Sequence, residues 1–500
     1  MAKLVTDYLE ETVLRFPEKT AYADESHEIT FRQLRDASFH VASCLVRKEI
    51  FRRPVVVYME KCVECIASFL GAAYSGNFYT PIDTTMPATR VGKILDTLQP
   101  EAVVTDREHL EKARELFPGR NLFLYEEMQD GEAEEQLVLE TASRVIDTDI
   151  LYILFTSGST GTPKGVIISH RSATDYTDWI TSRFDFNEKT IIGNQAPLYF
   201  DLSIQDVYAP ICCGCTTQLV PGSLFAAPKK LMEYLVEKNV NTIIWVPTAL
   251  CLMANMKALT LENLPKLEKV LFCGEVMPNK QLNIRRKAYP ETVFVNLYGP
   301  TEACDACSYY IVNREFADDE SLPIGKPCEN TDILVLNSED RLVGADEVGE
   351  LCIRGSSLAG GYYHDPEKTA AAFTQNPLNP WYPELIYRTG DLVKYNSYGE
   401  LEYVSRKDFQ IKHLGYRIEL GEIETVISSI PGVDLNCCLY DTKKKRIVLF
   451  YTGTVEKKEL MAKAASMLPE YMLPTKYNPL EEMPRNLNGK IDRQALKERI

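Results

Sequence analysis

The chain has 500 residues, of which 45% are hydrophobic and 25% are charged, and its formal net charge is −16. This length exceeds what one hydrophobic core usually serves, so we expect two or more domains of an ordinary globular protein. The acidic balance argues against nucleic acid as the main partner and against a polybasic membrane anchor, because both need a basic face.

Short apolar runs alternate with helical segments over most of the chain. The runs 54–59, 101–106, 241–246 and 269–274 are β-branched or aromatic and end in turn-forming residues, and helical stretches such as 229–239 lie between them. This alternation predicts α/β architecture with largely parallel sheets. No apolar run reaches about 18 residues, and the first residues predict an amphipathic helix, so we expect a cytoplasmic protein without stable membrane insertion.

The pattern changes in the last third of the chain. Residues of about 325–405 hold strands separated by Gly, Asp and Asn turns, which predicts a small β-barrel-like subdomain. Residues 406–500 predict a small α+β domain of two helices and a hairpin. The expected organisation is a large N-terminal core of layered α/β subdomains (1–405) and this C-terminal domain, with a short joint near Asp408.

The sequence contains 14 cysteines, and C-x-x-C spacing occurs at Cys62/Cys65 and at Cys304/Cys307. Such pairs suit zinc or redox chemistry. The first pair, however, lies in a stretch that predicts a buried helix, where cysteine acts as a small hydrophobic residue. No histidine falls at ligand spacing from either pair, so we favour reduced structural thiols without disulfides.

The stretch FTSGSTGTPKG (155–165) buries almost nothing and is rich in glycine and hydroxyl side chains. Glycines let backbone N–H groups approach an anion, hydroxyls add donors, and Lys164 adds a positive charge. The stretch is not a P-loop, because Gly165 follows the lysine and a strand follows the loop. Its composition predicts a phosphate-binding loop, with a flexible surface loop as the alternative.

The loop TSGSTGTPKG resembles the signature loop of the adenylate-forming superfamily, which includes acyl-CoA synthetases, luciferases and the adenylation domains of nonribosomal peptide synthetases. Further segments agree with that superfamily in order: TPID (80–83), FDLS (200–203), NLYGPTE (296–302), YRTGDL (387–392), RKDFQIKHLGYRIELGEIE (406–424) and NGKID (488–492). The resemblance covers essentially the whole chain. IELGEIE and NGKID are more similar to the amino-acid-activating branch than to the fatty-acid branch.

The resemblance implies that a carboxylate is joined to the α-phosphate of ATP with release of pyrophosphate, and that the acyl group then passes to a thiol. ATP and Mg²⁺ are the implied cofactors, because the crowded anionic transition state needs neutralising. The implied ATP-binding residues are Thr156, Ser157, Gly158, Ser159, Thr160, Gly161, Lys164, Asn296, Tyr298, Gly299, Thr301, Asp391 and Arg406.

Individual roles follow from the same resemblance. Tyr298 would stack on adenine and Asn296 would reach its amino edge. Thr301 would contact the α-phosphate. Asp391 would accept both ribose hydroxyls, which suits the two oxygens of a carboxylate, and Arg406 would add a ribose or phosphate contact.

The implied catalytic residues are Lys490, Glu302 and Thr156. Glu302 would help to hold magnesium, and Lys490 would bridge the substrate carboxylate and the phosphate. The small C-terminal domain would rotate about Asp408, and Gly415 would line a tunnel for a phosphopantetheine arm. Without the motif context, the alternative interpretation of Glu302 is a solvated loop acid and that of Lys490 is a surface lysine. Asp408 and Gly415 would be ordinary turn residues.

Asp201 in FDLS matches the aspartate that pairs with the substrate α-ammonium in amino-acid-activating members. The alternative is a helix N-cap. The remaining residues of the implied side-chain pocket are Leu202, Gln205, Ile244, Trp245, Leu271, Cys273, Leu297, Asp305 and Ala306.

Within the superfamily, the sequence most resembles the stand-alone ligases that activate D-alanine and pass it to a phosphopantetheinylated carrier protein in teichoic acid D-alanylation. FCGEV (272–276) resembles their pocket wall, in which the residue matching Cys273 disfavours the L-enantiomer; a plain strand-end residue is the alternative. Asp305 and Gln205 are unexpected in a pocket for a methyl group, which does not need polar neighbours. An unpaired buried carboxylate is also costly.

Other functions therefore stay open. A stand-alone adenylation enzyme for a more polar amino acid is one, an acyl-CoA ligase is another, and a non-catalytic nucleotide-binding regulator is a third. The basic run KKKR (443–446) is a candidate surface for docking the carrier protein or, alternatively, a solvated turn.

Overall fold

The computed structural model describes residues 4–158, 161–255, 259, 264–485 and 491–500. The chain forms two compact units. Unit 1 comprises residues 1–84, 99–154 and 166–407, and unit 2 comprises residues 85–98, 155–165 and 408–500. The boundary at Lys407 and Asp408 lies beside the predicted joint, whereas the two earlier segments of unit 2 were not predicted to belong with the C-terminal residues. Apart from this joint, the division into domains of residues 1–405 and 406–500 remains a prediction.

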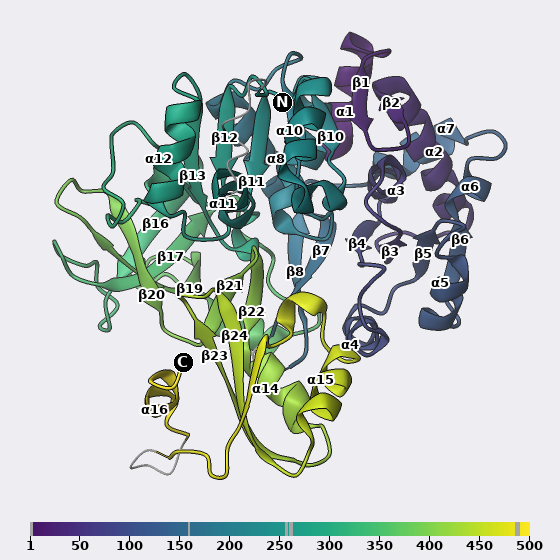
Figure 1. The fold of residues 1–500 in the computed structure, drawn as a ribbon. Coiled ribbons are helices and arrows are strands. Elements are labelled where there is room, and N and C mark those ends of the chain that lie inside the picture. Colours follow the sequence, from purple (N-terminus) through teal and green to yellow (C-terminus); the bar gives the residue numbers. More distant parts are fainter. Residues whose placement is uncertain (1–3, 159–160, 256–258, 260–263, 486–490) are drawn as a thin grey trace. The chain divides into compact units, whose positions relative to one another are not determined.

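Among the described residues, the largest sheet of unit 1 has nine strands in the order β15-β14-β13-β12-β11-β9-β10-β1-β2. Figure 1 labels β13, β12, β11, β10, β1 and β2 of this sheet. The nine strands are β1 (Thr20–Ala23), β2 (Glu28–Thr30), β9 (Ile191–Asn194), β10 (Thr216–Leu219), β11 (Thr242–Trp245), β12 (Lys269–Phe272), β13 (Val293–Tyr298), β14 (Ser308–Ile311) and β15 (Lys326–Pro327). The strands from β13 to β1 pair in parallel, and the pairs at both edges are antiparallel. The predicted parallel α/β architecture is confirmed.

Helical segments connect the parallel strands, as crossovers must. They are η1 (Asp201–Ser203), α9 (Ile204–Cys213), η2 (Gly222–Ala226), α10 (Pro228–Glu237), α11 (Pro247–Asn255) and α12 (Asn279–Ala288), with η4 (Thr301–Ala303) after β13. Because parallel strands end at the same edge, the residues that follow β9, β12 and β13 are brought towards one edge of the sheet. These are the segments that contain Asp201, Cys273 and Thr301.

A second sheet has the order β6-β5-β3-β4-β7-β8. Its strands are β3 (Pro54–Tyr58), β4 (Phe78–Pro81), β5 (Ala102–Thr105), β6 (Asn121–Leu124), β7 (Ile150–Thr156) and β8 (Lys164–Ser169), and the helices around it in sequence are α1 (Val5–Arg15), α2 (Phe31–Arg47), α3 (Val63–Tyr74), α5 (Leu110–Leu116), α6 (Tyr125–Met128), α7 (Glu135–Ala142) and α8 (His170–Arg183). Every residue of β3 is buried, which explains its continuous apolar sequence in a sheet covered on both faces. Helix α2 begins with a capping box, in which Thr30 accepts from the backbone of Gln33 and Gln33 accepts from Thr30.

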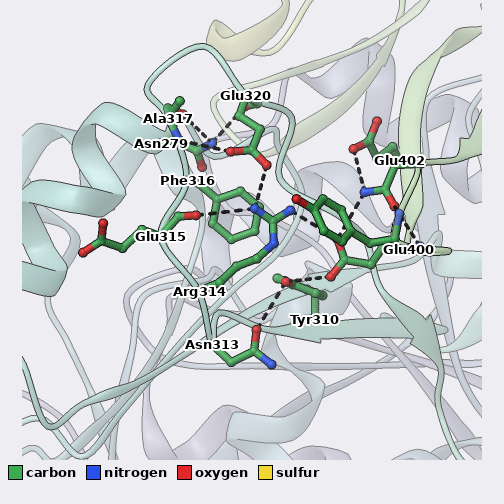
Figure 2. A network of polar contacts seen from close by, with 12 residues as sticks. Asn279, Tyr310, Asn313, Arg314, Glu315, Phe316, Ala317, Glu320, Glu400 and Glu402 are labelled. Carbon is green, nitrogen blue, oxygen red and sulfur yellow. Dashed lines mark hydrogen bonds and ion pairs between the residues drawn. The ribbon is translucent and has the colours of Figure 1, made fainter.

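The predicted β-rich region is a separate antiparallel sheet of unit 1. It contains β16 (Thr331–Leu336), β17 (Gly349–Gly355), β18 (Phe373–Gln375), β19 (Leu385–Tyr395) and β20 (Leu401–Arg406), with α13 (Pro366–Ala372) before β18. Figure 2 shows the polar network that ties it to the segment after β14. Arg314 contacts Glu320 at 2.6 Å and Glu400 at 3.3 Å, and the Tyr310 hydroxyl donates to Glu400 at 2.9 Å. The hydrogen bond from Arg314 lowers the pKa of Glu320 below its ordinary value.

Unit 2 has its own apolar core. Its elements are α4 (Ala88–Leu98), β21 (Gln410–His413), β22 (Tyr416–Glu419), α14 (Leu420–Ser428), β23 (Val433–Asp441), β24 (Arg446–Gly453), α15 (Lys457–Ala465), η5 (Glu470–Met472), β25 (Lys476–Pro479) and α16 (Arg493–Lys497). Ile423 and Ile427 of α14 pack with Leu449 of β24 and Leu460 of α15 in this core. The expected helices and hairpin are present.

Cys62 is the N-cap residue of α3 and only half-buried, so only Cys65 of that pair lies inside the buried helix, which corrects the sequence-based placement. None of the helices in the described ranges combines the length and apolarity that crossing a membrane requires.

Candidate active site

The glycine-rich loop joins β7 to β8, as predicted. A Cβ atom on Gly158 would lie 2.1 Å from the carbonyl oxygen of Thr162, and Gly161 has a φ of 80°. Both positions therefore require glycine. The hydroxyl of Thr156 is buried without a hydrogen-bond partner in the described part of the chain. A compact loop with an unsatisfied buried donor fits a site for phosphate oxygens. Ser159 and Thr160 lie outside the described residues.

Within unit 2, this loop contacts the strand β22 and the helix α14. Ser157 Oγ donates to the carbonyl oxygen of Arg417 at 2.7 Å and accepts from the backbone N–H of Glu419 at 3.1 Å. The N–H of Gly158 donates to Glu422 Oε2 at 3.3 Å. A carboxylate thus takes one of the backbone donors expected to face phosphate.

Glu422 is itself paired with Arg90 of α4, and the two side chains are only 2% and 5% exposed. Lys93 of the same helix donates to the carbonyl oxygen of Gly161 at 2.7 Å. The sequence reasoning missed these contacts. Glu422 lies inside the GEIE segment, which offered a signal, whereas nothing near Arg90 did.

In unit 1, three residues predicted to bind the nucleotide come together around Asp391. The hydroxyl of Tyr298, at the end of β13, donates to Asp391 Oδ2, and Arg406 Nη1 lies 2.8 Å from Asp391 Oδ1. Asp391 and Arg406 are direct partners in the β19–β20 ladder. Burial, and then the Asp391 carboxylate, raise the pKa of Tyr298 well above its ordinary value. Nearby on β13, Asn296 donates to the carbonyl oxygen of Pro323 at 2.8 Å.

Glu302, the predicted metal ligand, is fully buried in η4 and accepts a hydrogen bond from the Tyr362 hydroxyl at 2.7 Å. Its hard carboxylate oxygens suit Mg²⁺. The described residues contain a different group of three metal-capable side chains within 4.8 Å, namely Asp24, His27 and Glu64. A metal at Glu302 would thus depend mostly on substrate phosphates and water for its ligands, as Mg²⁺ commonly does.

Asp201 begins η1 and is held at both oxygens. Oδ1 accepts from the N–H of Leu202 at 2.9 Å, and Oδ2 accepts from the Thr301 hydroxyl. The residue in the N-cap position of α9 is Ser203, so Asp201 does not cap that helix and the alternative interpretation is wrong. The residue predicted to bind an ammonium therefore contacts the residue predicted to face the α-phosphate.

Asp305 is buried and paired. Tyr176 of α8 donates to Asp305 Oδ2 at 2.8 Å, and its oxygen also lies 3.1 Å from Gln205 Oε1. Gln205 Nε2 donates to the carbonyl oxygen of Leu202. Burial, and then Asp305, raise the pKa of Tyr176 well above its ordinary value. Sequence reasoning identified Asp305 and Gln205 as polar departures but missed Tyr176, which no motif marks.

The other residues of the predicted pocket are all buried; they are Leu202, Ile244, Trp245, Leu271, Cys273, Leu297 and Ala306. Gly299 needs to be glycine, because a Cβ would lie 2.2 Å from the carbonyl oxygen of Asp305. Asp408 begins the last segment of unit 2, residues 408–500. Gly415, with a φ of 83°, lies in the turn between β21 and β22. Lys490 lies outside the described residues.

Comparison with known proteins identifies the family. The model of the AMP-binding enzyme family matches residues 9–363. The chain belongs to this family. The assignment to the adenylate-forming superfamily made from the loop and its companion motifs is thereby confirmed.

Relatives differ in how much of their length the chain covers. The D-alanine–D-alanyl carrier protein ligase of Bacillus licheniformis is 33% identical over 507 residues, covering 97% of both chains. Tyrocidine synthase 1 of Brevibacillus parabrevis is 31% identical over 99% of this chain, which spans 45% of that relative's length. In a mycosubtilin synthase of Bacillus subtilis, 32% identical, the matched part is 19% of the relative.

Solved structures confirm the fold. A nonribosomal peptide synthetase protein with adenylation and PCP domains, bound to a vinylsulfonamide inhibitor, matches with a TM-score of 0.83 and 22% identity, covering all of this chain and 84% of the other. An o-succinylbenzoate CoA synthetase from Bacillus subtilis matches with a TM-score of 0.84 and 20% identity over 98% of both chains.

Proposed function

We propose that the protein is an ATP-dependent, AMP-forming ligase that activates an amino acid and transfers it to the phosphopantetheine thiol of a carrier protein. The end-to-end match with a D-alanine–D-alanyl carrier protein ligase carries this proposal. D-alanine is the amino acid that this match favours.

The first step joins the amino-acid carboxylate to the α-phosphorus of ATP and releases pyrophosphate. The proposal assigns the ribose to Asp391 and Arg406, the adenine to Tyr298 and Asn296, and the leaving phosphates to the glycine-rich loop with Lys164. Lys490 would bridge the substrate carboxylate and the phosphate. Bound Mg²⁺ would neutralise phosphate charge, and Glu302 is the residue that would hold it.

The second step transfers the aminoacyl group from AMP to a thiol. Here the proposal assigns the hinge to Asp408 and the thiol tunnel to Gly415. The proposed partner is a separate phosphopantetheinylated carrier protein. We further propose that the enzyme acts in teichoic acid D-alanylation. We also propose that it is cytoplasmic, because carrier thiols stay reduced in that compartment.

A second candidate is a stand-alone adenylation enzyme for a more polar amino acid. The Tyr176–Asp305 hydrogen bond of 2.8 Å and the fully buried Gln205 support it, because a methyl side chain has no need of these groups. Their mutual pairing, in turn, lowers the cost of burying them beside an apolar substrate. The geometry therefore leaves D-alanine acceptable.

ATP–pyrophosphate exchange over a panel of D- and L-amino acids tests the proposal. We expect exchange with D-alanine in preference to L-alanine. Exchange mainly with a polar amino acid, lost in Tyr176→Phe, would establish the second candidate. Strong exchange with fatty or aryl acids, accompanied by CoA thioester formation, would contradict the role of Asp201. Absence of exchange with every acid would favour a nucleotide-binding regulator.

A further inference from the structure

A chain of three polar side chains, two buried and one half-buried, connects the two α/β sheets of unit 1. Lys61 follows β3, and its Nζ lies 2.9 Å from Asn194 Oδ1 and 2.8 Å from the carbonyl oxygen of Val220. Asn194 Nδ2 in turn donates to Asp206 Oδ2 at 2.6 Å. Asn194 and Asp206 are 0% and 1% exposed. None of these side chains belongs to the nucleotide or pocket residues described above.

This network is expensive to bury. Burial raises the pKa of Asp206 to about 7, although the hydrogen bond from Asn194 and the charge of Lys61 oppose the shift. Burial also lowers the pKa of Lys61 to about 8. Asp206 Oδ1 has no partner among the residues that the structure describes. Apolar residues of similar volume often stabilise a protein equally well, so packing alone does not account for these groups.

The position of the network relative to Asp201 indicates what it fixes. Asn194 is the last residue of β9, Asp206 lies in the first turn of α9, and residues 195–205 between them contain Asp201. The Asn194–Asp206 hydrogen bond closes this segment at its base. Asn194 Nδ2 also donates to the carbonyl oxygen of Ala196 at 3.1 Å, which fixes the first turn of the segment.

Lys61 holds the closed base in place. It binds the Asn194 side chain and the Val220 carbonyl, while the N–H of Val220 donates to the Asn194 carbonyl oxygen at 3.2 Å. The ends of β9 and β10 are therefore both joined to the segment that follows β3. A rigid base matters because a displacement of about 1 Å in a group that orients a substrate can cost on the order of 100-fold in rate.

We propose that Lys61, Asn194 and Asp206 are positioning residues that fix the Asp201 carboxylate for the substrate ammonium. This inference rests on the proposed function, because it takes Asp201 as the ligand of that ammonium. The network moves no proton and touches no substrate. Its loss therefore weakens the use of the amino acid much more than the use of ATP, which Asp201 reaches only through the Thr301 hydroxyl.

Asn194→Ala tests the inference in amino-acid-dependent ATP–pyrophosphate exchange. We expect the KM for the amino acid to rise about 10-fold to 100-fold, while the KM for ATP stays within about twofold. Asn77→Ala is the matched control. Asn77 is 1% exposed and donates to the Ile50 carbonyl at 2.8 Å, away from residues 195–205. The control should lower thermal stability and leave both KM values unchanged.

Lys61→Met keeps the test informative if Asn194→Ala does not fold, because Lys61 is only half-buried and methionine preserves most of its volume. It should produce the same split between the two KM values. The double variant Lys61→Met/Asn194→Ala should lose less than the two single variants together, since residues of one network are not additive. Asp206→Asn, which retains an acceptor for Asn194, should restore most of the substrate use that Asp206→Ala loses.

Two failures are distinguishable. Robust exchange with an unchanged amino-acid KM in Asn194→Ala and Lys61→Met, or equal changes for ATP and amino acid, overturns the positioning role and leaves the proposed function intact. Absence of amino-acid-dependent exchange in the unaltered protein overturns both, because Asp201 then has no substrate ammonium to bind.

Discussion

Asp391→Asn tests the proposed ribose site most directly. Asp391 is 8% exposed at its side chain and Arg406 is 12% exposed, and the two lie 2.8 Å apart. Asparagine preserves the shape but removes the negative charge that Arg406 contacts at 2.8 Å. Removing one partner of a buried pair costs about 3–5 kcal/mol, and the slight exposure of Arg406 places the expected loss of unfolding free energy at about 3 kcal/mol.

The same substitution should weaken the use of ATP separately. A carboxylate that accepts from two hydroxyls makes hydrogen bonds to a charged group, each worth about 1.5–3 kcal/mol. Loss of roughly 2 kcal/mol of this binding raises the KM for ATP about 30-fold. Urea unfolding measures the first effect, and ATP–pyrophosphate exchange at saturating amino acid measures the second.

Glu400→Gln is the matched control, because Glu400 likewise joins a tyrosine hydroxyl to an arginine (Figure 2). Its side chain is 22% exposed, so a smaller loss of stability is expected, with no change in the KM for ATP. If Asp391→Asn lowers stability yet leaves the KM for ATP where the control leaves it, Asp391 is structural and the ribose assignment is wrong.

Two further predictions concern ion pairs within one unit, and a third concerns Asp408, where the last segment of unit 2 begins. Arg90→Met leaves the buried Glu422 carboxylate without this cation and should lower the unfolding free energy, measured in urea, by about 3–5 kcal/mol. Replacing both residues with methionine should recover most of that loss. An unaltered urea midpoint for the single variant would contradict the pairing. Asp408→Pro fixes φ at the residue where the last segment of unit 2 begins. It should impair thioester transfer to the carrier while sparing ATP–pyrophosphate exchange. Equal losses in the two half-reactions would refute a hinge at Asp408. Arg314 lowers the pKa of Glu320. The Arg314–Glu320 pair therefore contributes to the unfolding free energy above the ordinary carboxyl pKa, and this contribution disappears as the pH falls through the lowered pKa. Arg314→Met should therefore cost about 1 kcal/mol at neutral pH, and the unfolding free energies of the two proteins should converge as the pH falls through the lowered pKa of Glu320.

Local patterns were sufficient for much of the protein. The alternation of apolar runs and helical stretches predicted the parallel sheets, because a buried strand and an amphipathic helix each require their own spacing of apolar residues. The loop FTSGSTGTPKG predicted a phosphate site, because glycine and hydroxyl residues are needed wherever backbone donors meet an anion. The ordered motifs then placed Asp391, Arg406 and Tyr298 in one site, and the structure brings these three together.

The tertiary structure decided which side chains meet over long separations. Tyr176 and Asp305 are 129 positions apart, and Lys61 and Asn194 are 133 apart. Neither pair leaves a local pattern, because a hydrogen bond between distant residues imposes no periodicity on either segment. The sequence by itself determined the fold class and predicted a phosphate-binding role for the loop. How the pocket satisfies Asp305, and how Lys61 holds the segment that carries Asp201, depended on the packing of strands and helices far apart in the chain.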